Sequence, residues 1–154
     1  STLGVVANTT TSAPTQLANG FSGALSANTV YLAPADGAAF TATLPANASS
    51  KTGDVIVVLW NAAGTAGTAK FGTSTQMFAV GSTVYKGGGV EVNAVDVSDA
   101  TDDFLNIAYQ GNAGPGIGSK VTFQFNGTAW RAEARIAKLG TGATAHSNAV
   151  FHTA

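Results

Sequence analysis

Short apolar segments alternate with clusters of Gly, Asn, Ser, Thr and Pro along the whole chain. This punctuation is typical of an all-β sandwich or barrel, because each short strand is followed by a turn. Helical periodicity is almost absent. The pattern predicts strands over residues 2–7, 29–33, 40–44, 54–60, 68–71, 77–80, 90–97, 104–110, 120–125, 128–136 and 149–153.

The clearest local pattern is a hairpin around Asn126-Gly127. This dipeptide suits the two positive-φ positions of a type I′ turn, and a two-residue loop pairs Phe123 with Trp130. Period-2 alternation then separates an apolar face from a polar face. The apolar face comprises Val121, Phe123, Trp130, Ala132, Ala134 and Ile136, and the polar face comprises Arg131, Glu133 and Arg135.

A helix is the competing prediction for the second half of this hairpin. Residues 129–139 are rich in Ala, Arg, Glu, Lys and Leu, which favour helices. Gly140 follows at the position where helices often end.

Residues 54–60 show no alternation, because Val, Ile and Leu follow one another up to Trp60. A strand of this kind is expected to have protein on both faces. Such a strand lies either in the centre of the sandwich or at a contact with another subunit.

The two ends of the chain differ from the middle. Residues 8–14 and 140–147 are small polar linkers, each beside a short apolar segment. We predict an N-terminal arm and linker over residues 1–28, one antiparallel β-sandwich or barrel-like domain over 29–139, and a C-terminal arm over 140–154. The arms either add edge strands to their own sheet or dock on another molecule. The residues for such contacts are Leu3, Val5, Val6, Val150 and Phe151.

Composition narrows the classes of partner. Charged residues make up 10% of the chain and its formal net charge is −1, whereas an ordinary soluble domain has roughly 25% charged residues. The Lys and Arg residues are scattered, so neither nucleic acid nor an anionic membrane is an expected partner. The chain lacks Cys, and its apolar runs fall far short of the about 20 residues that span a bilayer. Its first residues do not resemble a signal peptide.

Some motifs invite a chemical interpretation. Residues 111–120 are glycine-rich, but the order Ser-Lys before a strand does not match a phosphate loop, so a flexible loop is predicted. The acidic residues 96–103 suit either a turn capped by its own side chains or a calcium ion. His146 and His152 match no known metal or catalytic arrangement, although a site on a symmetry axis can use one His per chain.

Catalysis is not expected, and we assign no catalytic residue, cofactor or metal ligand. The glutamates are Glu91 and Glu133, and each lies on the polar side of a predicted strand, so acid–base groups are poorly supplied. Aromatic residues either fill the core or form a platform for sugars. These residues are Trp60, Trp130, Tyr31, Tyr85 and Tyr109. Both Trp residues fall on apolar faces, which favours the core.

Several segments, in this order, resemble a β-domain of tailed-bacteriophage virion proteins, found in tail fibres, head fibres and capsid decoration (cement) proteins. They are Thr29-Val-Tyr-Leu32, Phe40-Thr-Ala-Thr-Leu-Pro-Ala46, Gly53-Asp-Val-Ile-Val57 and Phe123-Gln-Phe-Asn-Gly-Thr-Ala-Trp130. The resemblance covers residues 29–136. It implies a homotrimer about a threefold axis whose task is adhesion rather than chemistry.

The chain lacks the long shaft, heptads or collagen-like repeat of a typical fibre. We therefore expect a capsid decoration protein, a trimer that binds the major capsid protein on the outer surface of the virion and stabilises the shell. One alternative is a fibre or head-fibre domain that binds a host-surface glycan. A bacterial surface or pilus-like subunit is a further alternative.

Overall fold

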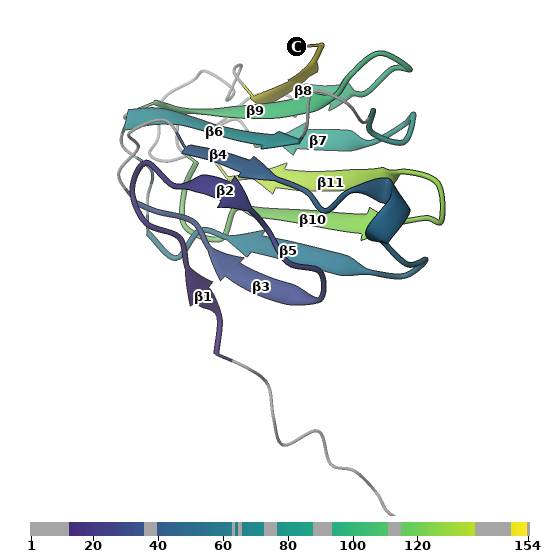
Figure 1. Ribbon diagram of the computed structural model, residues 1–154. Helices are drawn as coiled ribbons and strands as arrows, with labels where there is room; N and C mark the ends of the chain where they lie inside the picture. The colour runs from purple at the N-terminus through teal and green to yellow at the C-terminus, as the bar shows by residue number, and fades with distance from the viewer. Residues whose placement is uncertain are drawn as a thin grey trace, which may run out of the picture.

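The computed structural model describes residues 13–35, 40–62, 64, 66–72, 77–87, 94–110, 115–137 and 149–153. They form two β-sheets, and Figure 1 shows β2, β4, β6 and β9 lying in front of β5, β10, β11 and β7. The prediction of an all-β sandwich is confirmed. Within these ranges, no helix has the length and apolarity needed to cross a membrane.

Each sheet contains strands from both halves of the chain. The order in the seven-stranded sheet is β1 (Thr15–Gln16), β3 (Thr29–Leu32), β5 (Val55–Leu59), β10 (Lys120–Phe125), β11 (Trp130–Ile136), β7 (Thr83–Lys86) and β8 (Ala94–Val97). The order in the five-stranded sheet is β12 (Ala149–His152), β9 (Phe104–Gln110), β6 (Ala66–Gly72), β4 (Phe40–Thr43) and β2 (Ser22–Ala24). A short 3-10 helix, η1 (Asn47–Ser49), precedes β5.

Both sheets are mixed, which corrects the prediction of an antiparallel sandwich. Strands β1 to β7 alternate between the two sheets along the chain. Because the chain passes through the opposite sheet before it returns, β1, β3 and β5 are parallel neighbours, as are β2, β4 and β6. Strand β7 is also parallel to its neighbour β11. The remaining pairs are antiparallel.

Most predicted strands are present, with ends that differ by a few residues, and 104–110 and 120–125 match β9 and β10. A strand over 77–80 is wrong, since this segment is irregular and leads into a turn before β7. Strands β1, β2 and β7 were not predicted. Strands β1, β2 and β12 lie in stretches predicted as arms and belong to the two sheets. Residues 2–7 and 90–93 lie outside the described residues.

The hairpin between β10 and β11 is present, but its turn differs from the prediction. Phe125 pairs with Trp130, and Asn126 N–H donates to the carbonyl of Ala129 over 3.1 Å, so the loop is longer than two residues. Gly127 has a φ of +99°. The Asn126 side chain accepts from the backbone N–H groups of Thr128 and Ala129, a local cap that a type I′ turn lacks.

The faces of this hairpin are as predicted. Phe123 pairs with Ala132 instead of Trp130, a shift of two residues that keeps every side chain on its face. The predicted apolar face is buried and Arg131, Glu133 and Arg135 are exposed. The alternative of a helix over residues 129–139 is wrong, because β11 alternates between buried and exposed positions along its length.

Aromatic side chains fill the space between the sheets. The Trp60 indole N–H donates to the Tyr109 hydroxyl over 2.9 Å, and that hydroxyl donates to the carbonyl of Pro34 over 3.0 Å. Burial raises the pKa of the Tyr109 phenol well above its ordinary value, against a smaller lowering by the Trp60 hydrogen bond. The hydroxyl therefore stays neutral and remains a donor within the core.

One carboxylate joins the two sheets at their edges. Asp96 of β8 accepts a hydrogen bond of 2.7 Å from the backbone N–H of Phe151 in β12. Strand β12 is the edge of the five-stranded sheet, so this N–H has no partner strand on that side. The carboxylate satisfies it and leaves less of the edge open to another chain.

Replacing Asp96 by Ala is expected to lower the free energy of unfolding by about 1–3 kcal/mol, because the N–H of Phe151 loses its acceptor. Urea titration followed by circular dichroism measures this difference. Asp96→Asn keeps an acceptor oxygen and should lose less. Equal stability of the Ala variant and the unchanged protein would show that water replaces the carboxylate without cost.

Candidate functional site: the outer face of the seven-stranded sheet

The outer face of the seven-stranded sheet has three zones, which follow from the register of its strands. We call them the first apolar strip, the charged centre and the second apolar strip. The first apolar strip comprises Val30, Leu32, Val55, Val57 and Leu59 of β3 and β5. The charged centre comprises Lys120, Thr122, Gln124, Arg131, Glu133 and Arg135 of β10 and β11. The second apolar strip comprises Tyr85, Val95 and Val97 of β7 and β8.

Part of the first apolar strip is the outer side of β5. The sequence predicts that this strand has protein on both faces. Ile56 and Val58 of β5 are fully buried in the core. Val55, Val57 and Leu59 alternate with them and are only half-buried. The inner cover is confirmed, whereas the outer face of β5 lacks full cover among the described residues.

The second apolar strip is more open to solvent. The exposed fraction is 40% for Tyr85, 50% for Val95 and 55% for Val97. All three point outward because the residues between them, such as Val84, point into the core. Three exposed apolar side chains thus gather on two neighbouring strands of this face.

Buried serines fix the position of β7 and β8 against β11. The Ser82 hydroxyl accepts from the N–H of Ala132 over 3.0 Å and donates to the carbonyl of Ala79 over 2.8 Å. The Ser98 hydroxyl accepts from the N–H of Ser82 over 3.0 Å. These bonds begin the parallel pairing that places Tyr85 opposite Arg135.

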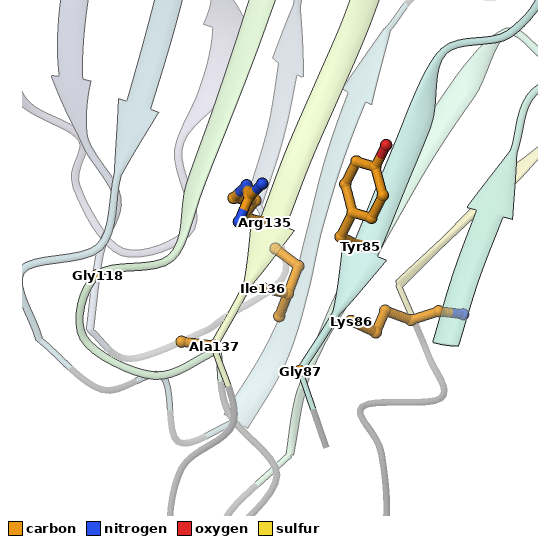
Figure 2. Close-up of a pocket in the computed structure, with 7 residues that line it drawn as sticks. All are labelled: Tyr85, Lys86, Gly87, Gly118, Arg135, Ile136 and Ala137. Carbon is orange, nitrogen blue, oxygen red and sulfur yellow. The ribbon is translucent and has the colours of Figure 1, made fainter. Parts of the chain in front are cut away.

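A cavity of about 320 Å³ lies at the border of the charged centre and the second apolar strip. We call it the Arg135 pocket. Its described lining residues are Tyr85, Lys86, Gly87, Gly118, Arg135, Ile136 and Ala137 (Figure 2). Figure 2 shows Arg135 and Tyr85 on neighbouring strands, with Lys86 extending away from both. A smaller cavity of about 160 Å³ shares Arg135 and is also lined by Lys120, Thr122 and Glu133.

The Arg135 guanidinium lies 5.6 Å from the centre of the Tyr85 ring, a cation–π distance. Within the described part of the chain, it forms no hydrogen bond and no ion pair. Lys120 is its cross-strand partner, so two cations stand side by side. Among the described residues, the Arg135 guanidinium therefore has donors without an acceptor, and it lines the pocket.

Within the acidic residues 96–103, Asp99 and Asp102 cap a turn that follows β8. Asp99 accepts from the backbone N–H and the hydroxyl of Thr101, and Asp102 accepts from the N–H of Asp99. The bonds from Thr101 hold the pKa of Asp99 below its ordinary value. In the ranges that the structure describes, no three His, Asp or Glu side chains lie close enough to hold a metal ion. The turn-capping alternative thus accounts for Asp99 and Asp102.

His152 stacks on the ring of Phe104, with ring centres 5.4 Å apart, and its Nδ1 lies 2.8 Å from the carbonyl oxygen of Thr153. The Lys70 ammonium lies 3.6 Å from the centre of the same Phe104 ring. Together they cover an aromatic side chain on the outer face of the five-stranded sheet. His146 and Glu91 lie outside the described residues.

The aromatic residues singled out in the sequence are buried, with one exception. Trp60, Trp130, Tyr31 and Tyr109 are buried, and the prediction of a core role for the two Trp residues is confirmed. Tyr85 alone of this predicted set is exposed. No platform of several aromatic rings forms from them, and Tyr85 lies beside the Arg135 pocket instead.

The predicted contact residues are placed as follows. Val150 is half-buried, and Phe151 is buried with its ring 5.5 Å from that of Phe78. The alternative of an added edge strand therefore holds for β12, and contact with a capsid or another subunit stays a prediction. Leu3, Val5 and Val6 lie outside the described residues.

Comparisons with known protein families, with curated proteins and with solved structures find no match to this chain. Its function is therefore inferred from the geometry of the outer face.

Proposed function

We propose that this chain is a capsid decoration protein of a tailed bacteriophage, which binds the major capsid protein on the outer surface of the virion as a homotrimer and stabilises the shell. Its task is adhesion, and none of its residues performs catalysis. The observation behind this proposal is the pair of apolar strips on one sheet, with Val30, Tyr85, Val95 and Val97 between 38% and 55% exposed.

The two strips suit a ring of identical subunits. A twofold dimer uses one patch against itself, whereas a ring joins two different patches of neighbouring subunits. The first and second apolar strips lie on different strands, separated by the charged centre. In the proposed trimer, the first strip of one subunit packs against Val95 and Val97 of the second strip of the next. Tyr85, which lies beside Arg135 of the charged centre, stays outside this contact. Apolar burial at about 25 cal/mol per Å² drives the contact.

Low charge favours the same conclusion. With 10% charged residues, the sheets have few of the Lys and Glu side chains that normally keep sheet edges apart. Contacts with neighbouring subunits and with a capsid lattice would cover these surfaces. The resemblance of residues 29–136 to phage virion domains points to that lattice.

An Asp placed in either strip is expected to convert the trimer to monomer, because a charge would be buried at the subunit contact. Val57→Asp tests the first strip and Val97→Asp tests the second. Thr122→Asp is the matched control, since it adds the same charge to the same outer face outside both strips. Size-exclusion chromatography with light scattering gives the mass of each variant.

Capsid binding is measured with empty, expanded capsids of the phage that encodes the chain, prepared without it. The unchanged protein and Thr122→Asp should sediment with these capsids, and both strip variants should lose about tenfold or more in affinity. A monomeric unchanged protein that ignores capsids would contradict the proposal. Equal behaviour of the strip variants and the control would remove the role of the strips.

A further inference from the structure

We propose that the Arg135 pocket binds the carboxylate of an acidic saccharide. This inference goes beyond the decoration role and does not depend on it. The pocket is a cavity of about 320 Å³, near the lower end of the range for small-molecule sites. It therefore has room for one sugar unit rather than for a folded partner.

Arg135 has unused hydrogen-bonding capacity with respect to the described residues. Its guanidinium contacts the Tyr85 ring and, among the described residues, has no hydrogen-bond partner and no carboxylate partner. Arg presents a planar fork of donors that matches a carboxylate in two parallel hydrogen bonds. A ligand carboxylate would supply the acceptors that the described residues do not.

Positive charge gathers around Arg135. Lys120 lies directly opposite Arg135 across the β10–β11 pair, and like charges in this position repel each other. Glu133 also lines the smaller cavity beside them, and Lys86 lines the Arg135 pocket but extends away from Arg135 in Figure 2. These four side chains have a net charge of about +2. This positive charge suits an anionic ligand such as a carboxylate, and inorganic phosphate serves as the comparison anion.

The lining of the Arg135 pocket combines one aromatic ring with residues that have small side chains or none. Tyr85 offers an exposed flat ring, against which the apolar face of a sugar can pack. Gly118 borders the cavity with a φ of +91°, and a Cβ atom added there would meet nothing within 4 Å. Gly87 and Ala137 line the same cavity with little or no side chain, so these two residues leave room for a ligand.

To test this proposal, the full chain is titrated with N-acetylneuraminic acid and, separately, with glucuronic acid at constant ionic strength. NMR chemical shifts monitor binding. We expect millimolar binding, with shifts at Tyr85, Gly118 and Arg135. Glucose, acetate and inorganic phosphate are the comparison ligands and should bind at least about tenfold more weakly. A short peptide with a free C-terminus tests whether a protein carboxylate binds equally well.

Arg135→Gln is expected to weaken binding of both sugar acids about tenfold or more. Arg131→Gln is the matched control, because Arg131 lies on the same strand and face but lines neither cavity. Lys120→Gln provides a second variant, with a smaller expected loss, if Arg135→Gln does not fold. Tyr85→Ala should weaken the sugar acids and leave acetate unchanged.

Several outcomes would overturn the proposal. They are no binding of either sugar acid, equal loss in Arg131→Gln and Arg135→Gln, and equal affinity for acetate, phosphate or the peptide. The decoration role would stand in each case, because it is tested by mass and capsid binding. Conversely, a monomer that ignores capsids but binds sugar acids through Arg135 would retain this proposal alone.

Discussion

Replacing Phe71 by Ala is expected to lower the free energy of unfolding by about 3–5 kcal/mol. Phe71 is fully buried on β6 of the five-stranded sheet. Its ring centre lies 5.5 Å from that of Phe40, 6.5 Å from that of Trp60 and 5.3 Å from that of Phe123. Because Trp60 and Phe123 come from the opposite side of the sandwich, the variant loses contacts that join the two sheets.

Urea unfolding followed by circular dichroism measures the loss from Phe71→Ala. Domains of this size are stable by about 5–15 kcal/mol, so the variant is expected to unfold at a much lower urea concentration. Tyr85→Ala removes an aromatic side chain from the exposed outer face and should cost under about 1 kcal/mol. Equal losses in the two variants would mean that Phe71 does not join the sheets as its contacts indicate.

Strands are predicted best from the sequence where apolar and polar residues alternate over a long segment, which puts the apolar side chains on one face. Strands β9 and β10 have these properties, and their residues match the predicted ranges. The β10–β11 hairpin shows how robust the face assignment is. Its loop was predicted too short, yet Phe123 and Trp130 remain on the buried face because the error in register is an even number of residues.

Sequence predicts least where strands are short or pair over long distances. Strands β1, with Thr-Gln, and β2, with Ser-Gly-Ala, have no apolar alternation to detect. Met77 to Val80 contains apolar residues, but only Phe78 among them points into the core. Parallel pairing of β1, β3 and β5 is also invisible, because alternation reveals which face is buried and not which strand lies beside it.

The outer-face site could not be predicted for the same reason. Arg135 and Tyr85 were each recognised, one as a polar-face residue and the other as an aromatic candidate. Their contact depends on the parallel pairing of β11 with β7. This pairing follows from the path of the chain through both sheets and from the buried Ser82 bond to Ala132, neither of which has a local pattern.

One edge of the sandwich is protected against an added strand, whereas the outer face of the seven-stranded sheet exposes apolar side chains. At one edge, Asp96 of β8 occupies the free N–H of Phe151 and so limits strand addition to β12. On the outer face, the same strand β8 exposes Val95 and Val97. Partners are thus expected to contact side chains of the outer face rather than to extend the sheet at β12.

Replacing Gly72 by Ala is expected to lower the free energy of unfolding by at least about 3 kcal/mol. Gly72 ends β6 with a φ of +132°, a conformation that residues with a Cβ rarely adopt. A Cβ at this position would lie 2.1 Å from the carbonyl oxygen of Asp103. Because that oxygen belongs to the backbone just before β9, the neighbouring strands β6 and β9 would have to move apart.

Gly53→Ala separates the two causes of this loss. Gly53 also has a positive φ, +93°, but a Cβ there meets nothing within 4 Å. It should therefore cost only the backbone term of about 1–2 kcal/mol, and the remaining loss in Gly72→Ala measures the clash with Asp103. Thermal and urea unfolding of both variants give the two values. If they agree within about 0.5 kcal/mol, the β6–β9 contact yields without cost, and the close approach of these strands does not constrain the fold.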